Sequence, residues 1–147
     1  LEGLSQAVSR HSILTRFIVL DIPVADYSAD SAKLKAIAQY CRSRGFAIAL
    51  DDVTSTQGLE SLLTEVRPGF VKLDAKIGRM PSPARNSTLT DIVRLSHDAG
   101  AMVLAEGVET EELHNLYLAA GVDLFQGYLF GKPERRHPKT RVTRSAS

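Results

Sequence analysis

The sequence has few of the residues that build disulfide, metal-cluster or membrane proteins: one cysteine and no tryptophan in 147 residues. A single cysteine, Cys41, excludes a disulfide within the chain and a cysteine metal cluster, and it fits a reducing cytoplasm best, so we expect a cytoplasmic protein. No segment approaches the ~18 consecutive apolar residues that a membrane-spanning helix needs. The 18 Lys and Arg residues nearly balance the 17 Asp and Glu residues, so the overall charge favours neither nucleic acid nor an anionic membrane as a partner.

Short apolar runs alternate with amphipathic stretches between residues 17 and 130, a pattern typical of repeated β-α units and a mainly parallel sheet. We expect strands at about 17–22, 46–51, 70–74, 102–106 and 123–129, and helices at 31–44, 59–66, 88–99 and 111–120. A chain of this length and apolar content forms one core. We therefore expect one domain over residues 1–133 and a basic, disordered tail over residues 134–147.

Every predicted strand ends in a charged or polar group, and the carboxyl ends of parallel strands meet on one rim of a sheet or barrel. The groups are Asp21, Asp51 and Asp52, Lys72 and Asp74, Glu106, and Gln126. One such residue is usually a helix cap or a turn carboxylate, but five strand ends in succession favour a site.

The fold class that we expect is α/β: a (β/α) barrel of the TIM type in partial form, with about five parallel strands and their helices. A closed barrel of this type has eight strands, and an open edge must be covered or paired. The chain is then either missing the N-terminal half of a larger domain or a homo-oligomer in which another copy supplies the wall. A doubly wound sheet is the alternative, but no G-x-G-x-x-G loop follows the first strand.

The adjacent carboxylates of Asp51 and Asp52 repel one another unless a cation or a proton relieves the repulsion. Mg²⁺ or Mn²⁺ fits better than zinc, because no His or Cys stands at a strand end. Lys72 and Glu106, on neighbouring strands, would add a cation near an attacking water and a general base. This combination indicates metal-assisted hydrolysis of a phosphoester.

Four segments, ALDD at 49–52, FVKLD at 70–74, AEGVET at 105–110 and DLFQGYLFGKP at 123–133, together resemble the second half of the EAL-domain cyclic-di-GMP phosphodiesterases. The resemblance runs from about Phe17 to Pro133. It implies a barrel that takes Mg²⁺ or Mn²⁺ as cofactor and cyclic di-GMP as ligand. The metal ligands that it implies are Asp21, Asp51, Asp52 and Glu106, the catalytic residues are Glu106, Lys72 and Asp52, and the substrate-binding or accessory residues are Asp74, Glu109 and Gln126.

The chain departs from the family pattern at two loops. The family has E-x-T-E where this chain has Asp21 to Val24, so a metal-binding oxygen remains but a bracing carboxylate is lost. The family has F-G-T-G where this chain has Val53 to Thr56, so this chain lacks the glycines that permit a tight loop there. The Glu-Ala-Leu signature and a metal-binding Asn of the family are expected upstream of this sequence.

We therefore expect an EAL-type cyclic-di-GMP signalling domain of the phosphodiesterase family that is inactive in this truncated or degenerate form. The alternative is a non-catalytic module that binds a nucleotide or a partner protein. A barrel enzyme of unrelated chemistry is a third interpretation, because a fold does not fix a function.

Overall fold

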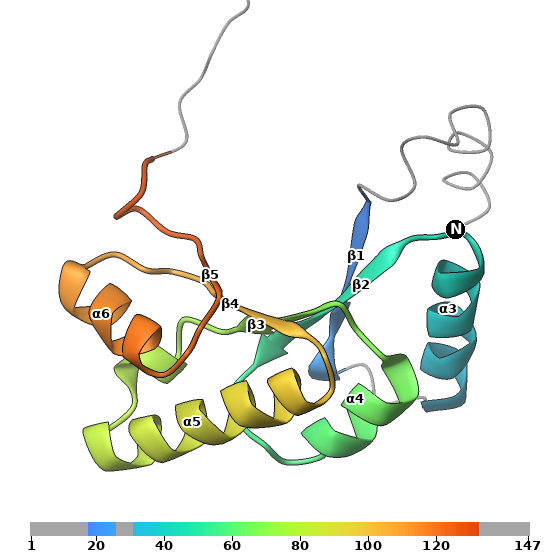
Figure 1. Cartoon of the computed structure of the whole chain (residues 1–147), viewed down its shortest axis with the longest axis horizontal. Coiled ribbons are helices and arrows are strands. Elements are labelled where there is room, and N and C mark those ends of the chain that lie inside the picture. The colour runs from blue at the N-terminus through green and yellow to red at the C-terminus, as the bar shows by residue number, and fades with distance from the viewer. Residues whose placement is uncertain (1–17, 26–30, 133–147) are drawn as a thin grey trace, which may run out of the picture.

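The computed structural model describes residues 18–25 and 31–132, and it contains one five-stranded parallel sheet. The strands are β1 (Val19–Pro23), β2 (Ala47–Val53), β3 (Phe70–Leu73), β4 (Met102–Ala105) and β5 (Leu124–Phe125). The helices are α3 (Ser31–Ser43), α4 (Leu59–Val66), α5 (Ser82–Asp98) and α6 (Glu111–Ala119), with a 3₁₀ turn η2 (Ile77–Arg79) after β3. Each strand pairs in parallel with the strand that follows it in sequence, as Figure 1 shows.

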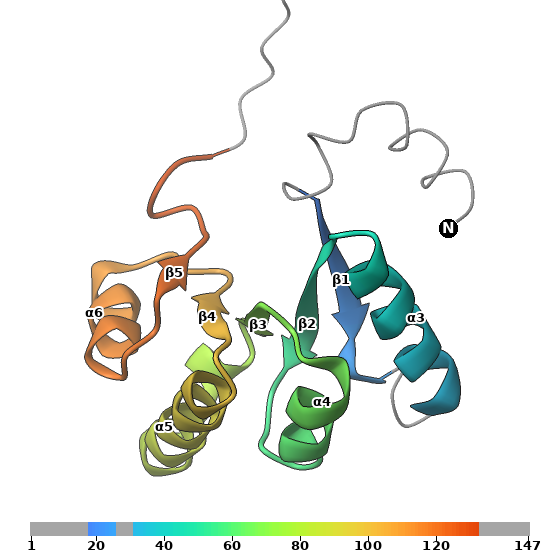
Figure 2. The ribbon, with the colours of Figure 1, turned by 45° about the vertical axis from the view of Figure 1, so that its right-hand side comes forward.

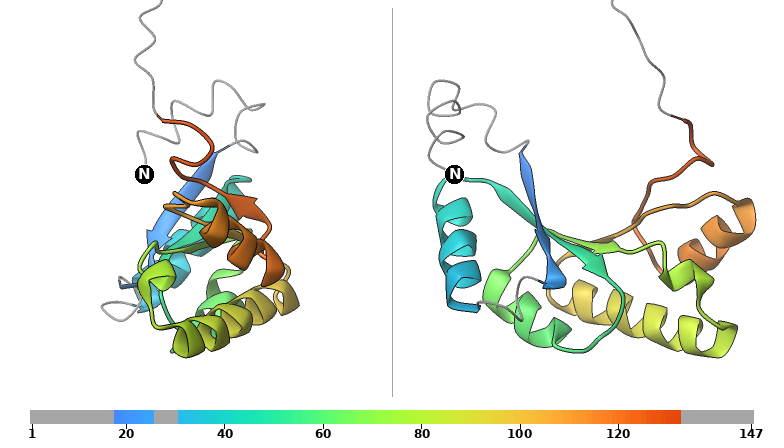
Figure 3. Two further views of the ribbon diagram at one scale, coloured as in Figure 1. Left: turned by 90° about the vertical axis from the view of Figure 1, so that its left-hand side faces the viewer. Right: turned by 180° about the vertical axis from the view of Figure 1, so that it is seen from behind.

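The sheet curves into an arc, and the helices lie on its outer side (Figure 2). The view from behind, on the right of Figure 3, shows α3 and α6 at opposite ends of the arc. An arc of parallel strands with helices outside it is a section of a (β/α) barrel. The prediction of an α/β partial barrel with five parallel strands and four helices on one side is confirmed.

The core lies between the outer face of the sheet and the helices. Buried residues alternate along β3 and β4, where Val71, Leu73, Val103 and Ala105 are almost fully covered. Because side chains alternate between the two faces of a strand, Lys72 points to the opposite, inner face of the arc. The helices supply the rest of the core from positions at helical spacing, among them Leu59, Leu62, Leu63 and Val66 in α4 and Leu89, Ile92, Val93 and Ser96 in α5.

Helix α5 starts at Ser82, well before the predicted start near Thr88. Its first turns carry the polar residues Arg85, Asn86 and Ser87, so the sequence shows no apolar residues at helical spacing there. Pro83 lies in the first turn, where a backbone N–H has no partner within the helix in any case. The proline therefore marks the start of this helix.

Two strands also differ in length from the prediction. β2 continues through Val53, which is buried in the core and pairs with Leu73. β5 has only two residues, because the chain turns after Phe125 and the Phe130 N–H bonds to the Gly127 carbonyl at 3.1 Å. The predicted strand at 123–129 is therefore wrong in its second half.

None of the helices in the described part of the chain combines the length and apolar character that crossing a bilayer requires. The tail predicted for residues 134–147 lies outside the described residues.

Candidate functional site

Four charged side chains from four successive strands meet on the inner face of the arc. The Lys72 Nζ atom lies 3.0 Å from Asp21 Oδ2, 3.1 Å from Asp51 Oδ1 and 2.9 Å from Glu106 Oε1. Asp21 comes from β1, Asp51 from β2 and Lys72 from β3, and Glu106 follows β4 directly. The predicted common rim is confirmed for these four residues, which we call the rim cluster.

The rim cluster holds three carboxylates around one ammonium group, so one cation balances only part of the negative charge. The Lys72 side chain is only 15% exposed. Burial alone would lower the pKa of Lys72, but hydrogen bonds to Glu106, Asp21 and Asp51 and the charge of Glu106 raise the pKa well above its ordinary value. Lys72 therefore stays protonated throughout the neutral range.

A bulge in β2 separates the two adjacent aspartates. The pairing of β2 with β3 shifts register between Leu50 and Val53, and Asp52 takes a left-handed backbone conformation with φ 59°. The Asp52 N–H donates to Asp51 Oδ1 at 3.0 Å, and bulges commonly re-aim side chains beside active sites. Asp51 reaches Lys72, whereas the exposed Asp52 side chain makes no ion pair within the described residues.

Asp74 closes the turn that leads from β3 into η2. Its carboxylate accepts hydrogen bonds from the Lys76 backbone N–H at 2.8 Å and from Lys76 Nζ at 2.9 Å. These two hydrogen bonds lower the pKa of Asp74 below its ordinary value. The hydrogen bond to Asp74 and its charge also raise the pKa of Lys76, with a smaller contribution from the charge of Asp52. The structure thus brings Asp74 and Asp52 toward Lys76 and leaves them out of the contacts around Lys72.

Glu109 and Gln126 lie on two segments that are joined through their backbones. The Gln126 N–H donates to the Ala105 carbonyl at 2.8 Å, and the Val108 N–H donates to the Gln126 carbonyl at 3.0 Å. The side chains of Glu109 and Gln126 are exposed, and neither has a polar partner in the described chain. Both are therefore free to contact a ligand at this end of the sheet.

The donor set suits a hard divalent cation, but the oxygens now surround an ammonium group. Within residues 18–25 and 31–132, no group of three or more His, Cys, Asp or Glu side chains is arranged to hold an ion as it stands. Carboxylate oxygens lie 2.9 to 3.1 Å from Lys72 Nζ, whereas Mg²⁺ takes oxygens at about 2.0–2.1 Å. Asp21, Asp51 and Glu106 would hold an ion after moving inward, and Asp52 would join them only by turning from its present position.

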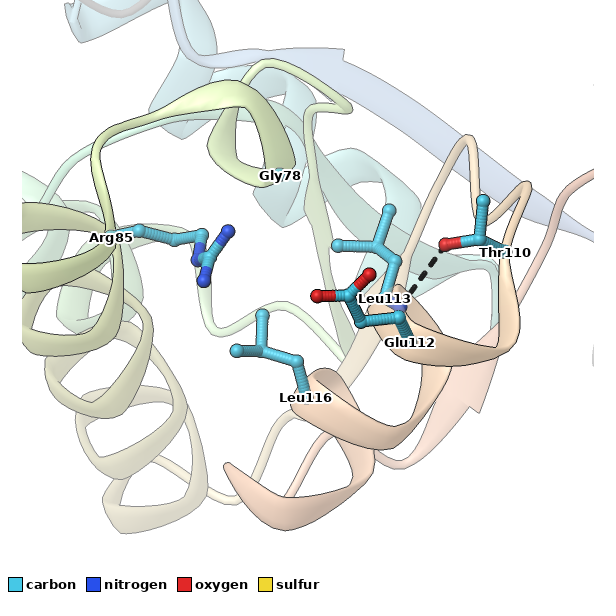
Figure 4. Close-up of a pocket in the computed structure, with 6 residues that line it drawn as sticks. All are labelled: Gly78, Arg85, Thr110, Glu112, Leu113 and Leu116. Atoms are coloured by element: carbon cyan, nitrogen blue, oxygen red, sulfur yellow. Dashed lines mark hydrogen bonds between the residues drawn. The ribbon is translucent and has the colours of Figure 1, made fainter.

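Sequence reasoning missed a hollow away from the rim cluster, which lies between η2, α5 and α6. It has a volume of about 250 Å³ and is lined by Gly78, Arg85, Thr110, Glu112, Leu113 and Leu116. Figure 4 shows the Arg85 and Glu112 side chains pointing into it from opposite sides, and Thr110 Oγ1 accepting a hydrogen bond from the Leu113 N–H at 3.2 Å. Of these features, only the Thr110 helix cap had a sequence signal, namely its place before the acidic first turn of α6.

His114 is a further residue that the sequence did not single out. Its ring makes edge-on contacts with Phe125, at 4.6 Å between centroids, and with Phe130, at 5.4 Å. The position of His114 in a helical pattern gave no hint of this aromatic group, because Phe125 lies in β5 and Phe130 in the segment after β5, and only the fold brings them against α6.

A model of the EAL domain family matches residues 1–133. The chain belongs to the EAL domain family. Cyclic di-GMP phosphodiesterase PdeF of Escherichia coli (strain K12) is 25% identical to this EAL domain over 132 residues, which is 88% of this chain and 18% of PdeF. The chain thus spans less than a fifth of the length of that relative.

Solved structures of EAL proteins superpose on the same arc. The Bacillus subtilis YkuI protein, solved with substrate cyclic di-GMP and calcium, has a TM-score of 0.77 and 25% identity over 92% of this chain and 33% of its own. The manganese and cyclic-di-GMP complex of Klebsiella pneumoniae BlrP1 has a TM-score of 0.68 and 29% identity over 78% of this chain and 30% of its own. This EAL domain therefore corresponds to about one third of each of those chains.

Proposed function

We propose that the rim cluster is part of a metal-dependent cyclic-di-GMP phosphodiesterase centre, and that residues 1–147 by themselves do not complete it. The observation that carries the proposal is the convergence of Asp21, Asp51 and Glu106, from three different strand ends, on one cation. PdeF is a cyclic di-GMP phosphodiesterase, and YkuI and BlrP1 were solved with cyclic di-GMP and a divalent metal, which supports the same ligands here.

In this proposal Asp21, Asp51, Asp52 and Glu106 hold Mg²⁺ or Mn²⁺. A bound divalent ion would lower the pKa of a water and polarise the phosphodiester. Glu106, whose side chain is 31% exposed, is accessible to accept a proton from that water. Lys72 cannot serve as the base, because its pKa is raised and it stays protonated. Its role is to stabilise the negative charge that develops on the phosphate.

The three accessory residues have different roles in this proposal. Glu109 and Gln126 have exposed side chains that make no polar contact within the described residues, so we assign them to contacts with cyclic di-GMP. Asp74 is already hydrogen-bonded to Lys76. It therefore acts indirectly, by fixing the turn that follows Lys72.

The expected lack of turnover follows from the ligands and from the first loop. Mg²⁺ demands near-octahedral oxygen coordination, and two-metal hydrolysis needs both ions held ~3.5–4 Å apart. The 147 residues contain no Glu-Ala-Leu sequence, and Val24 packs against the core where the family carries a carboxylate. A misplacement of ~1 Å can cost about a hundredfold in rate.

The test is an assay of residues 1–147 with cyclic di-GMP and either Mg²⁺ or Mn²⁺. We expect no linear pGpG from this chain, and we expect hydrolysis by the complete gene product. Formation of pGpG by residues 1–147 that is abolished in Glu106→Ala would overturn the claim that the site is incomplete. Failure of the complete gene product to cleave cyclic di-GMP, beside an active relative, would overturn the enzyme proposal.

A second candidate function is binding without turnover, which the exposed Thr54-Ser55-Thr56 loop and Val24 favour. Both changes alter loops and leave the rim cluster intact. Calorimetric titration with cyclic di-GMP and with pGpG separates a nucleotide-binding module from a protein-interaction module. If neither nucleotide gives a heat of binding, only the protein-interaction module remains. A cytoplasmic location belongs to either version, since the described cysteine, Cys41, is buried and free, as in a reducing compartment.

A further inference from the structure

The Lys72 ammonium stands at the point where carboxylates from three strand ends converge. Its Nζ atom is within 3.1 Å of Asp21, Asp51 and Glu106. No other side chain reaches all three of these carboxylates among the described residues, and the Lys72 side chain is mostly covered. In the structure, therefore, the cation that holds these carboxylates together is part of the protein itself.

We propose that Lys72 is an internal competitor for the metal: its ammonium fills the cation position of the rim cluster, and a divalent ion binds only by displacing it. The inference rests on the proposed function only in taking the rim cluster as the metal site.

Two physical arguments require the displacement. Like charges strongly disfavour one another at close range in a partly desolvated site, so an ammonium and a divalent ion cannot share the centre of three carboxylates. The oxygens also stand at ammonium distances from the centre, and they must move inward to reach a metal ion. Displacement frees the Lys72 side chain from its present contacts with Asp21, Asp51 and Glu106. Metal binding thus sets the position of Lys72.

The test measures Mn²⁺ affinity of the full chain by the loss of the free-ion electron paramagnetic resonance signal, with no nucleotide present. A nearby unit charge commonly shifts a proton affinity by one to three pKa units, so removal of the ammonium should strengthen Mn²⁺ binding by about tenfold or more in Lys72→Met and Lys72→Gln. Lys72→Arg keeps the charge and should bind as weakly as the wild type.

Lys35→Met is the matched control, because Lys35 pairs with Glu65 at 3.0 Å between α3 and α4, outside the rim cluster. It should leave the Mn²⁺ affinity unchanged. The melting temperature provides a second readout: without metal, Lys72→Met should melt below the wild type, since three carboxylates lose their shared cation, and Mn²⁺ should raise its melting temperature more than that of the wild type. If Lys72 had a purely structural role, its replacement by Met would lower both the stability and the Mn²⁺ affinity.

Equal or weaker Mn²⁺ binding by both neutral variants would overturn the inference, as would the absence of binding in every variant. If the variants fail to fold, an Mg²⁺ titration of the wild type decides: the side-chain ¹⁵Nζ resonance of Lys72 should shift as Mg²⁺ binds, and binding with no shift would overturn the inference. None of these measurements uses cyclic di-GMP, so a negative phosphodiesterase assay would contradict the proposed enzyme activity without affecting this inference. Hydrolysis by the complete gene product, together with an unaltered Mn²⁺ affinity in Lys72→Met, would contradict this inference alone.

Discussion

Gly127 lies directly against the backbone of Val108, with no room for a Cβ atom between the two segments. The Val108 N–H bonds to the Gln126 carbonyl, and the Leu129 N–H bonds to the Val108 carbonyl at 3.1 Å. These bonds fasten the segment after β5 to the loop that carries Glu106. The contact therefore links the most C-terminal described segment to the rim cluster.

We predict that Gly127→Ala destabilises the fold, because the added methyl group must push the two backbones apart. Overpacking of this kind typically costs about 1–3 kcal/mol of unfolding free energy. Urea unfolding followed by circular dichroism measures it. Gly69→Ala is the control, since a Cβ at Gly69 meets only the Ile48 carbonyl at an ordinary 3.9 Å. Equal stability of the two variants would contradict the predicted close approach.

Asp123 joins the end of α5 to β4. Its Oδ2 atom accepts the Val103 N–H at 2.7 Å and lies 2.9 Å from His97 Nε2. We predict that Asp123→Ala costs about 1–3 kcal/mol, because a buried backbone donor loses its acceptor. Asp98→Ala, which removes an exposed carboxylate on the same helix end, should cost far less. Chemical denaturation at neutral pH compares them, and similar losses would refute the role of Asp123.

The same carboxylate makes stability depend on pH. Burial would raise the pKa of Asp123, but the hydrogen bonds from Val103 and His97 outweigh it and lower the pKa below its ordinary value. A carboxylate whose pKa is lowered in the folded state stabilises the fold at any pH above its unfolded-state pKa of about 3.9. This stabilisation is lost as the pH falls through the folded-state pKa. The stability difference between the wild type and Asp123→Asn should therefore shrink as the pH falls below ~4. A difference that grows on acidification below pH ~4 would reverse the assigned sign.

Asp51 is the residue whose loss should remove any metal binding that the chain retains. It reaches the centre of the rim cluster from β2, and the family resemblance implies that it is a metal ligand. We predict that Asp51→Ala abolishes the Mn²⁺-dependent loss of the free-ion resonance signal. Asp91→Ala serves as the control, because among the residues that the structure describes the Asp91 carboxylate pairs only with Arg94 on α5. Unchanged Mn²⁺ binding in Asp51→Ala would place the ion elsewhere.

Within residues 18–25 and 31–132, β1 and β5 each pair with one strand only, so we predict self-association through an open edge. Light scattering should give a mass above that of the 16.0 kDa chain. Val19 on β1 is 44% exposed, and Val19→Lys should reduce the association, because charges protect edge strands from pairing. Leu118→Lys, at a 56% exposed position on α6, should not. A stable monomer across concentrations would count against the prediction.

The sequence predicted the strands and the rim because β-α alternation leaves a strong periodic signal. Lys72 and Glu106 follow or end apolar runs, and parallel pairing in register then forces them to one edge. Local geometry without a periodic signal could not be predicted. The bulge at Asp52, which separates the two adjacent aspartates, depends on the pairing of β2 with β3. The adjacent aspartates predicted a divalent cation as their counter-charge, but only the fold shows that Lys72, from the next strand, pairs with Asp51.

The order of the strands in the sheet is the order of the strands in the sequence. Each strand therefore pairs in parallel with its neighbour in sequence through a single crossover connection. A chain with this topology can fold progressively during synthesis, because each new β-α unit docks on the one made just before it. The same topology makes the edge of β1 or β5 a docking site for another β-α unit, whether it belongs to the same polypeptide or to a separate one. The inner face of the arc can then be covered by complementation between two chains.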